Sequence, residues 1–370
     1  GEGSLVDPDL QEGMFDIEVY GDPRDPAAPN DAPCEALFLG DPTGGSVGTI
    51  PGPDHPSQNN YCASSAGEPQ PLRYTADRTV WYSFLAPSTG SVEVEVNSDF
   101  IYPFGYDAID LRLAAYTAQG CGGPFTELFS GDDRYFNVDS VFLHCLTPGD
   151  TIFLQVDGSA MDGEGYFDLT IHERPGAVAP PNDDLCGSLL IDPWSDPDTL
   201  YGQNNICTDA AGDPAPSAFT PERTVWYHFE TPAMGGPFAV EIMAISSWPY
   251  PYGPDAIDLR MAVFESDNEQ CSGGLNEVQS AWDPLQFNAS MSVHCLDAGR
   301  TYFLMVDGSD VDPMGYFDLI VTQIPSVPQP TNDLICDAIP LDTVPIGGSI
   351  DDGVSYFNFC STADTGEPNA

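Results

Sequence analysis

The chain has 370 residues, enough for two or three domains, and 58 Asp and Glu against nine Lys and Arg give it a formal net charge of −49. That charge excludes nucleic-acid binding and simple adhesion to anionic lipid, because both need a cationic face. Gly and Pro number 36 each, which without a collagen period indicates many short strands joined by turns. The sequence has no apolar run of about 18 residues, so we expect no membrane span.

The first 22 residues match a phrase that returns twice further along the chain. Gly3-Ser4 and Gly13-Met14-Phe15-Asp16 correspond to Gly158-Ser159 and Gly165-Tyr166-Phe167-Asp168. We therefore expect residues 1–22 to be the C-terminal strands of a preceding repeat.

Residues 31–174 are predicted to form one complete repeat. Val92-Glu93-Val94-Glu95-Val96 alternates strictly, which predicts a strand with one buried and one wet face. About eight short strands in about 145 residues favour an all-β fold, an antiparallel, jelly-roll-like β-sandwich. Runs of β-branched and aromatic residues bounded by Gly, Pro, Asp or Ser predict strands over residues 79–86, 91–97, 108–117, 141–146, 151–158 and 165–172.

Residues 182–324 are predicted to form a second complete repeat, because whole phrases of the first recur about 150 residues later. The organisation is thus a tandem array of sandwiches. The shared phrases are Arg-Thr-Val-Trp-Tyr from Arg78 and Arg223, Asp-Ala-Ile-Asp-Leu-Arg from Asp107 and Asp255, and Val-Asp-Gly-Ser from Val156 and Val306.

Residues 332–370 match the start of a further repeat, through Asn332-Asp333, Cys360 and Gly366-Glu367-Pro368. Two fragments therefore flank two complete repeats. We expect a window from a longer array rather than a subunit whose ends are completed by strand donation from its neighbours. Pro-rich joints favour extended polyproline geometry and are expected to act as semi-rigid spacers at residues 22–30, 175–181 and 325–330.

The cysteines recur four to each complete repeat. Their spacing is not that of a zinc site, so we predict disulfides formed in an oxidising compartment, which places the chain outside the cell or on its surface. Four cysteines allow three pairings, and we favour those that close short local loops. The favoured pairs are Cys34–Cys62, Cys121–Cys145, Cys186–Cys207, Cys271–Cys295 and Cys336–Cys360.

Several phrases together resemble repeats of large secreted bacterial surface proteins. They are an Asn-Asp-x-x-Cys opening, Gly-Glu-Pro, Thr-Val-Trp-Tyr-x-Phe, a paired-Asp strand, and Val-Asp-Gly before Gly-Tyr-Phe. The modules look similar to pre-peptidase C-terminal and CUB-like jelly-roll domains, over both complete repeats and both fragments. The resemblance implies a role in cell-surface structure, in adhesion or beside a secreted enzyme, often with bound Ca²⁺. A Pro- and aromatic-rich insertion before the paired Asp departs from shorter members.

Paired aspartates recur at strand ends and tight turns in both repeats. Clustered carboxylate oxygens suit Ca²⁺, so one structural calcium site per repeat is our hypothesis, and Asx-turn hydrogen bonding is the alternative. A catalytic carboxylate pair must face its partner across a substrate and would rarely be duplicated in every repeat, so we predict no catalytic residue. The candidate ligands are Asp107, Asp110, Asp157, Asp162, Asp168, Asp255, Asp258, Asp307, Asp312 and Asp318.

Aromatic residues on Pro-stiffened segments occupy the same slot in both repeats. Such rings pack against their own or an adjacent repeat, contact another chain in a fibre, or stack on sugars. Trp81 and Trp226 lie in strong strands and are predicted core residues. Asn288 opens a glycosylation sequon, whereas Asn60, Asn205 and Asn358 each precede a cysteine by two and suggest a structural hydrogen bond. The slot holds Tyr102, Phe104, Tyr106, Trp248, Tyr250 and Tyr252.

Three functions remain open. The leading hypothesis is a non-catalytic structural segment of an extracellular fibre, stalk or adhesin shaft, stabilised by calcium, whose partners are neighbouring repeats or copies of itself. The second is a carbohydrate-binding array that recognises surface glycans through the aromatic segments. The third is an accessory array attached to a secreted hydrolase.

Overall fold

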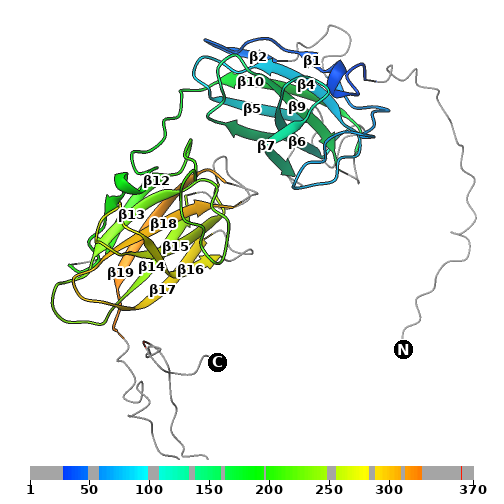
Figure 1. The fold of residues 1–370 in the computed structure, drawn as a ribbon. Coiled ribbons are helices and arrows are strands. Elements are labelled where there is room, and N and C mark those ends of the chain that lie inside the picture. The colour runs from blue at the N-terminus through cyan, green and yellow to red at the C-terminus, as the bar shows by residue number, and fades with distance from the viewer. Residues whose placement is uncertain are drawn as a thin grey trace, which may run out of the picture.

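The computed structural model describes residues 28–48, 58–98, 108–132, 138–159, 163–195, 197–247, 256–282, 288–309 and 313–326, together with Cys360. Within these ranges the regular structure is β-strand apart from two short 3-10 turns, η2 (Pro33–Glu35) and η3 (Leu185–Gly187). The strands form two sandwiches that follow one another along the chain, blue to green and then green to orange in Figure 1. The predicted all-β sandwich fold is therefore confirmed.

The first sandwich packs one sheet of order β1-β4-β9-β6-β7 against a second of order β2-β10-β5-β8, with β3 also paired to β10. Consecutive strands therefore alternate between the two sheets, except that β2 and β3 share one sheet and β6 and β7 share the other. This alternation is typical of a jelly roll. Its strands are β1 (Leu37–Phe38), β2 (Ser46–Gly48), β3 (Gln58–Asn59), β4 (Val80–Leu85), β5 (Val92–Ser98), β6 (Leu111–Ala118), β7 (Phe125–Asp132), β8 (Val138–Leu143), β9 (Thr151–Gly158) and β10 (Tyr166–Glu173).

The second sandwich repeats this topology, with sheets of order β11-β13-β18-β15-β16 and β12-β19-β14-β17. One longer strand, β12, takes the place of β2 and β3. Its strands are β11 (Leu189–Leu190), β12 (Asp198–Asn204), β13 (Val225–Glu230), β14 (Phe238–Ser246), β15 (Leu259–Ser266), β16 (Leu275–Trp282), β17 (Asn288–Leu296), β18 (Thr301–Gly308) and β19 (Tyr316–Gln323).

The six strands predicted for the first repeat correspond to β4, β5, β6, β8, β9 and β10, with ends shifted by a few residues. The prediction missed the short strands β1, β2 and β3, and it also missed the longer strand β7. That strand lies at the edge of its sheet and pairs with β6 alone, and its Thr126, Glu127 and Ser130 break the apolar pattern. An edge strand needs little apolar surface, so periodicity marks it poorly.

The main core of each sandwich lies between its two sheets. On β5, Val92, Val94 and Val96 are fully buried while Glu93 and Glu95 are partly exposed, as the alternation predicts. Each such valine contributes about 1.5–3 kcal/mol through burial.

A smaller apolar cluster covers the outer face of the β4-β9-β6 sheet. Trp81 lies there at 0% exposure, against Tyr116 and Phe153, because it points away from its neighbours Val80 and Tyr82 in the main core. Trp226 occupies the same place in the second sandwich. Both tryptophans are core residues, as predicted. The loop before β4 covers this outer cluster, so that loop is part of the fold.

None of the described residues belongs to a helix that is long and apolar enough to cross a membrane.

Candidate functional site: a disulfide junction between the sandwiches

The disulfides differ from the predicted pairs. Two lie within a sandwich, Cys34–Cys121 and Cys186–Cys271, and each staples the opening turn of a repeat to the turn after its β6 or β15 strand. Of the other two, Cys145–Cys207 joins the two sandwiches, and Cys295–Cys360 joins the second sandwich to a later part of the chain. All five local pairings predicted from the sequence are therefore wrong. Cys336, the ninth cysteine along the chain, lies outside the described residues.

Loop length is a poor guide to disulfide pairing for a physical reason. The entropy cost of closing a loop grows only logarithmically, so the roughly threefold longer Cys34–Cys121 loop costs about 1 kcal/mol more than a Cys34–Cys62 loop. A jelly roll brings turns far apart in the chain together, and this proximity decides the pairing. Each observed bond lowers the conformational entropy of the unfolded chain. On chain-entropy grounds this raises the free energy of unfolding by about 4 kcal/mol per bond.

The first half of the junction is the turn after β8. Cys145 has a positive φ of 62°, and the next residue, Leu146, donates its N–H to the carbonyl oxygen of Gly90 at 2.9 Å. Gly90 itself has φ +66°, and a Cβ there would lie 2.6 Å from the Leu146 carbonyl oxygen. The turn that presents Cys145 therefore depends on glycine at position 90.

The second half is the turn after β12. The buried Asn205 side chain donates to the carbonyl oxygens of Arg223 at 2.8 Å and Pro313 at 2.7 Å, and accepts from the Gly315 N–H at 2.9 Å. Cys207 follows with φ 63°. These three hydrogen bonds fix the turn, which confirms the structural role predicted for Asn205. Asn358 lies outside the described residues.

The linker between the sandwiches is fastened at both ends. On the first sandwich, Arg174 and Ala177 donate backbone N–H groups to the carbonyl and hydroxyl oxygens of Ser91, at 2.9 and 3.3 Å. On the second, Asn182 accepts the Trp226 N–H at 2.8 Å and returns a side-chain bond to the Trp226 carbonyl oxygen at 3.1 Å. The short linker and the Cys145–Cys207 bond thus make two separate tethers.

The aspartate of each Val-Asp-Gly-Ser phrase is buried, accepts backbone hydrogen bonds from the loop before the Trp strand and pairs with an arginine. We call this arrangement a lock. Asp157 is 0% exposed and accepts the backbone N–H groups of Arg78 at 2.8 Å and Asp77 at 3.1 Å. Arg112, opposite it on β6, brings its guanidinium to 3.7 Å and lies over the Tyr74 ring. Burial raises the pKa of the Asp157 carboxyl, while these hydrogen bonds and the Arg112 charge oppose that shift.

The second sandwich repeats the lock with a closer ion pair. The Asp307 carboxylate accepts the Arg223 N–H at 2.8 Å and lies 2.8 Å from the guanidinium of Arg260, which covers the Phe219 ring. Burial again raises the pKa of the Asp307 carboxyl, against the Arg260 charge. Sequence reasoning singled out the aspartates and missed the arginines, although an arginine ends both copies of the Asp-Ala-Ile-Asp-Leu-Arg phrase.

The remaining described aspartates of the predicted calcium set lie at strand ends and in β10 and β19. The carbonyl oxygens of Asp110 and Asp258 accept N–H groups from Ser159 and Ser309, both at 2.8 Å. Asp318 accepts the Gly202 N–H at 2.8 Å, and burial raises the pKa of the Asp168 carboxyl.

These residues do not fit a calcium ion by themselves. The structure gathers no three His, Cys, Asp or Glu side chains that could hold a metal among the residues it describes, and arginine already neutralises Asp157 and Asp307. The calcium site stays a prediction that depends on four aspartates outside the described residues, Asp107, Asp162, Asp255 and Asp312.

The acid of the Gly-Glu-Pro phrase holds the loop over the outer tryptophan. In the first sandwich the Glu68 carboxylate accepts the Thr79 hydroxyl and the Gln155 amide. In the second, Asp213 accepts the Thr224 hydroxyl and, at 3.2 Å, the Trp226 indole N–H. Burial raises the pKa of both carboxyls.

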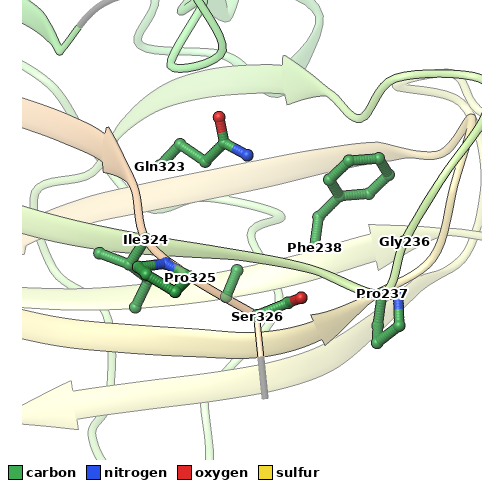
Figure 2. A pocket seen from close by; sticks show the side chains of 8 residues that line it. Gly236, Pro237, Phe238, Gln323, Ile324, Pro325 and Ser326 are labelled. Carbon is green, nitrogen blue, oxygen red and sulfur yellow. The ribbon is translucent and has the colours of Figure 1, made fainter. Parts of the chain in front are cut away.

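An open hollow of about 430 Å³ lies where the chain leaves the second sandwich. Figure 2 shows Phe238 and Gln323 at one part of it, and Pro325 and Ser326 at another. In the first sandwich the corresponding surface lies around Ser91, whose hydroxyl oxygen accepts the N–H of the linker residue Ala177. We therefore interpret the hollow as part of the linker surface.

The six aromatic residues predicted to contact fibres or glycans lie outside the described residues, so that role stays a prediction. Asn288 begins β17, is exposed and accepts the Ser246 N–H at 3.1 Å through its side chain. Its glycosylation also stays a prediction.

No protein-family model and no curated protein matches the chain. Similar solved structures include tripeptidyl peptidase 2, at 9% identity over 78% of this chain and 24% of that chain, with a TM-score of 0.25. A chain of the Sulfolobus Turreted Icosahedral Virus matches at 10% identity over 68% of this chain and 57% of that one, TM-score 0.19. This chain therefore spans about a quarter of the peptidase and somewhat over half of the viral chain.

Tandem CBM51 modules of a family 98 glycoside hydrolase from Streptococcus pneumoniae match at 11% identity over 76% of this chain and 97% of that chain, with a TM-score of 0.18. Likenesses this weak carry no information about function.

Proposed function

We propose that the chain is a non-catalytic structural segment of an extracellular fibre, stalk or adhesin shaft, in which each sandwich is covalently bonded to the next. The Cys145–Cys207 disulfide carries this proposal, because it joins the two complete sandwiches independently of the backbone. Cys295–Cys360 extends the same connection toward a further repeat. Disulfides persist in oxidising compartments, which supports the extracellular location.

The two tethers explain how such a segment would resist bending. Ala177 is bonded to the first sandwich and Asn182 to the second, so few linker residues are left to flex. A second connection at Cys145–Cys207 restricts rotation about that short linker. Beads joined at two points keep their orientation better than beads on one strand, and a shaft or stalk requires this.

Calcium binding and the resemblance to pre-peptidase C-terminal and CUB-like modules stay finer parts of the proposal, and an accessory array attached to a secreted hydrolase stays a separate alternative. Recognition of surface glycans is the alternative function, and it depends on the aromatic segments at residues 102–106 and 248–252. Substituting Trp248 and Tyr250 with alanine would abolish glycan retention if the alternative holds.

Electron microscopy of native material tests the proposal. We expect filaments or stalks of evenly spaced beads, and we expect a reductant to make the spacing and orientation irregular without unfolding the beads. Isolated short particles whose shape does not respond to reduction would overturn the structural function. Retention of the intact chain on a glycan array would favour the alternative.

A further inference from the structure

We infer that the Cys62 thiol is a preformed acceptor for one more inter-repeat disulfide, and that its partner is the cysteine of a His-Cys-Leu turn on another sandwich of this repeat type. The inference rests on the proposed function, since it extends the same junction. Among the cysteines that the structure describes, Cys62 is the one with a free thiol, and it is exposed.

Equivalent cysteines in the same molecule show the pairing rule. Cys62, Cys207 and Cys360 hold the same place in successive repeats, with φ values of 58°, 63° and 58°. Cys207 and Cys360 each bond to a cysteine of the repeat before them. Both bonded examples follow one rule, and Cys62 has the same backbone conformation as the two that obey it.

The turn around Cys62 is already built in the absence of a partner. Asn60 donates to the carbonyl oxygens of Arg78 at 2.9 Å and Gly163 at 2.6 Å, and accepts the Gly165 N–H at 3.0 Å. These three bonds reproduce those of Asn205, described above. Asn60 is 0% exposed. A preformed turn reduces the entropy lost when a partner binds.

The partner turn is equally distinctive. His144-Cys145-Leu146 and His294-Cys295-Leu296 share their sequence, and Cys145 and Cys295 both have positive φ, 62° and 67°. Each bonds to a residue of the Cys62 type and not to its own kind. The matching half for Cys62 is therefore a His-Cys-Leu turn.

A single substitution in the intact chain provides both halves of the predicted disulfide for a test. Cys360→Ser removes the partner of Cys295 and leaves a free His-Cys-Leu thiol at one end and Cys62 at the other. In a buffer of oxidised and reduced glutathione, the two thiols lose two protons and two electrons to one molecule of oxidised glutathione, which yields one protein disulfide and two molecules of reduced glutathione. Salt near 1 M screens the repulsion between chains of charge −49.

We expect Cys360→Ser to form head-to-tail dimers and longer oligomers, and non-reducing peptide mapping to identify Cys295 of one molecule bonded to Cys62 of another. Cys295→Ser is the matched control, because it frees Cys360, a thiol of the same type as Cys62. It should give several-fold less covalent dimer. The Cys62→Ser, Cys360→Ser double variant should form no Cys295 cross-link of this kind.

Equal dimer yields from Cys360→Ser and Cys295→Ser, or preferential bonding of Cys62 to Cys336, would overturn the inference. The same digest reports the Cys145–Cys207 peptide. If that peptide is present and the Cys295–Cys62 bond does not form, the inference fails while the junction of the proposed function stands. If the Cys145–Cys207 peptide is absent, the proposed function itself fails.

Discussion

Arg260 and Asp307 face each other across β15 and β18, and their buried side chains meet at 2.8 Å on the outer face of that sheet, beneath Phe219 of the loop before β13. The pair explains why two phrases that are widely separated in sequence recur together. The Asp-Ala-Ile-Asp-Leu-Arg phrase supplies the guanidinium, and the Val-Asp-Gly-Ser phrase supplies the carboxylate. The chain has only nine basic residues, and among those that the structure describes it buries Arg112 at the Asp157 lock and Arg260 at the Asp307 lock.

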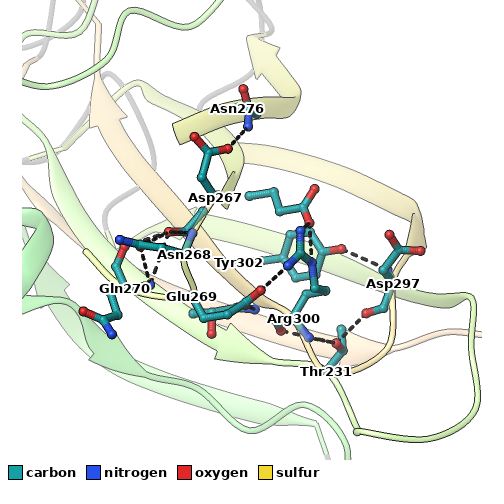
Figure 3. Close-up of polar contacts among 12 residues, drawn as sticks. Thr231, Asp267, Asn268, Glu269, Gln270, Asn276, Asp297, Arg300 and Tyr302 are labelled. Carbon is teal, nitrogen blue, oxygen red and sulfur yellow. Dashed lines mark hydrogen bonds and ion pairs between the residues drawn. The ribbon is translucent and has the colours of Figure 1, made fainter. Parts of the chain in front are cut away.

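Replacing Arg260 with Met should destabilise the second sandwich by about 3–5 kcal/mol, because it leaves the Asp307 carboxylate buried without its counter-charge. Urea unfolding followed by tryptophan fluorescence measures this loss. Arg300→Met is the matched control. Arg300 pairs with Glu265 and Glu269 at the surface, beside Thr231 and Asp297 (Figure 3), where solvent screens the charges, so its loss should be much smaller. Equal losses in both variants would contradict the lock.

Mild acidification should stabilise the fold. Burial raises the folded-state pKa of Asp213 above 3.8 and that of Glu68 above 4.5, so the folded chain binds more protons than the unfolded chain in the range above those values. The stabilisation is fully present below the unfolded pKa and is lost as pH rises through the folded pKa. The melting temperature should therefore rise as pH falls toward the unfolded-state values of 4.5 and 3.8.

Asp213→Asn tests the assignment of that pH dependence, because asparagine keeps an acceptor for Thr224 and cannot titrate. The variant should show a flatter dependence of melting temperature on pH than the parent chain. A slope that does not change would mean that Asp213 does not contribute, and a slope of opposite sign would contradict the direction of both shifts.

Most of the longer strands were predictable because their signals are local. The alternation at Val92 to Val96 and the phrase around Trp81 each lie within a few residues, and periodicity is a local property. The disulfides were not predictable, because Cys34 and Cys121 meet through strand order, to which the sequence between them gives no direct guide. For the same reason the aspartates were singled out as metal ligands while Arg112, the partner of Asp157 in the folded sheet, was missed.

Calcium should raise the melting temperature at low ionic strength if the predicted site forms. Binding to the folded state alone stabilises by about 2.7 kcal/mol at a free ion concentration one hundred times the dissociation constant. Calorimetry with added Ca²⁺ and then with EDTA measures the shift. Asp107→Asn with Asp162→Asn should abolish the response of the first sandwich. If EDTA leaves the parent melting temperature unchanged, the calcium hypothesis is wrong.

Force applied along the chain should distinguish a bonded junction from a flexible linker. The Cys145–Cys207 bond bridges a sequence separation of 62 residues, and this loop overlaps the one closed by Cys186–Cys271. Once force unfolds both sandwiches, loss of the first bond lengthens the load path from Cys145 to Cys271 from 21 residues (207 − 186) to 41 residues (186 − 145), which adds roughly 70 Å of contour length at ~3.3–3.6 Å per residue. Single-molecule extension of the parent and of the Cys145→Ser, Cys207→Ser double variant measures the difference. The variant should extend by this amount without reductant. If parent and variant reach the same length in the absence of reductant, the junction does not bear load and a shaft cannot rely on it.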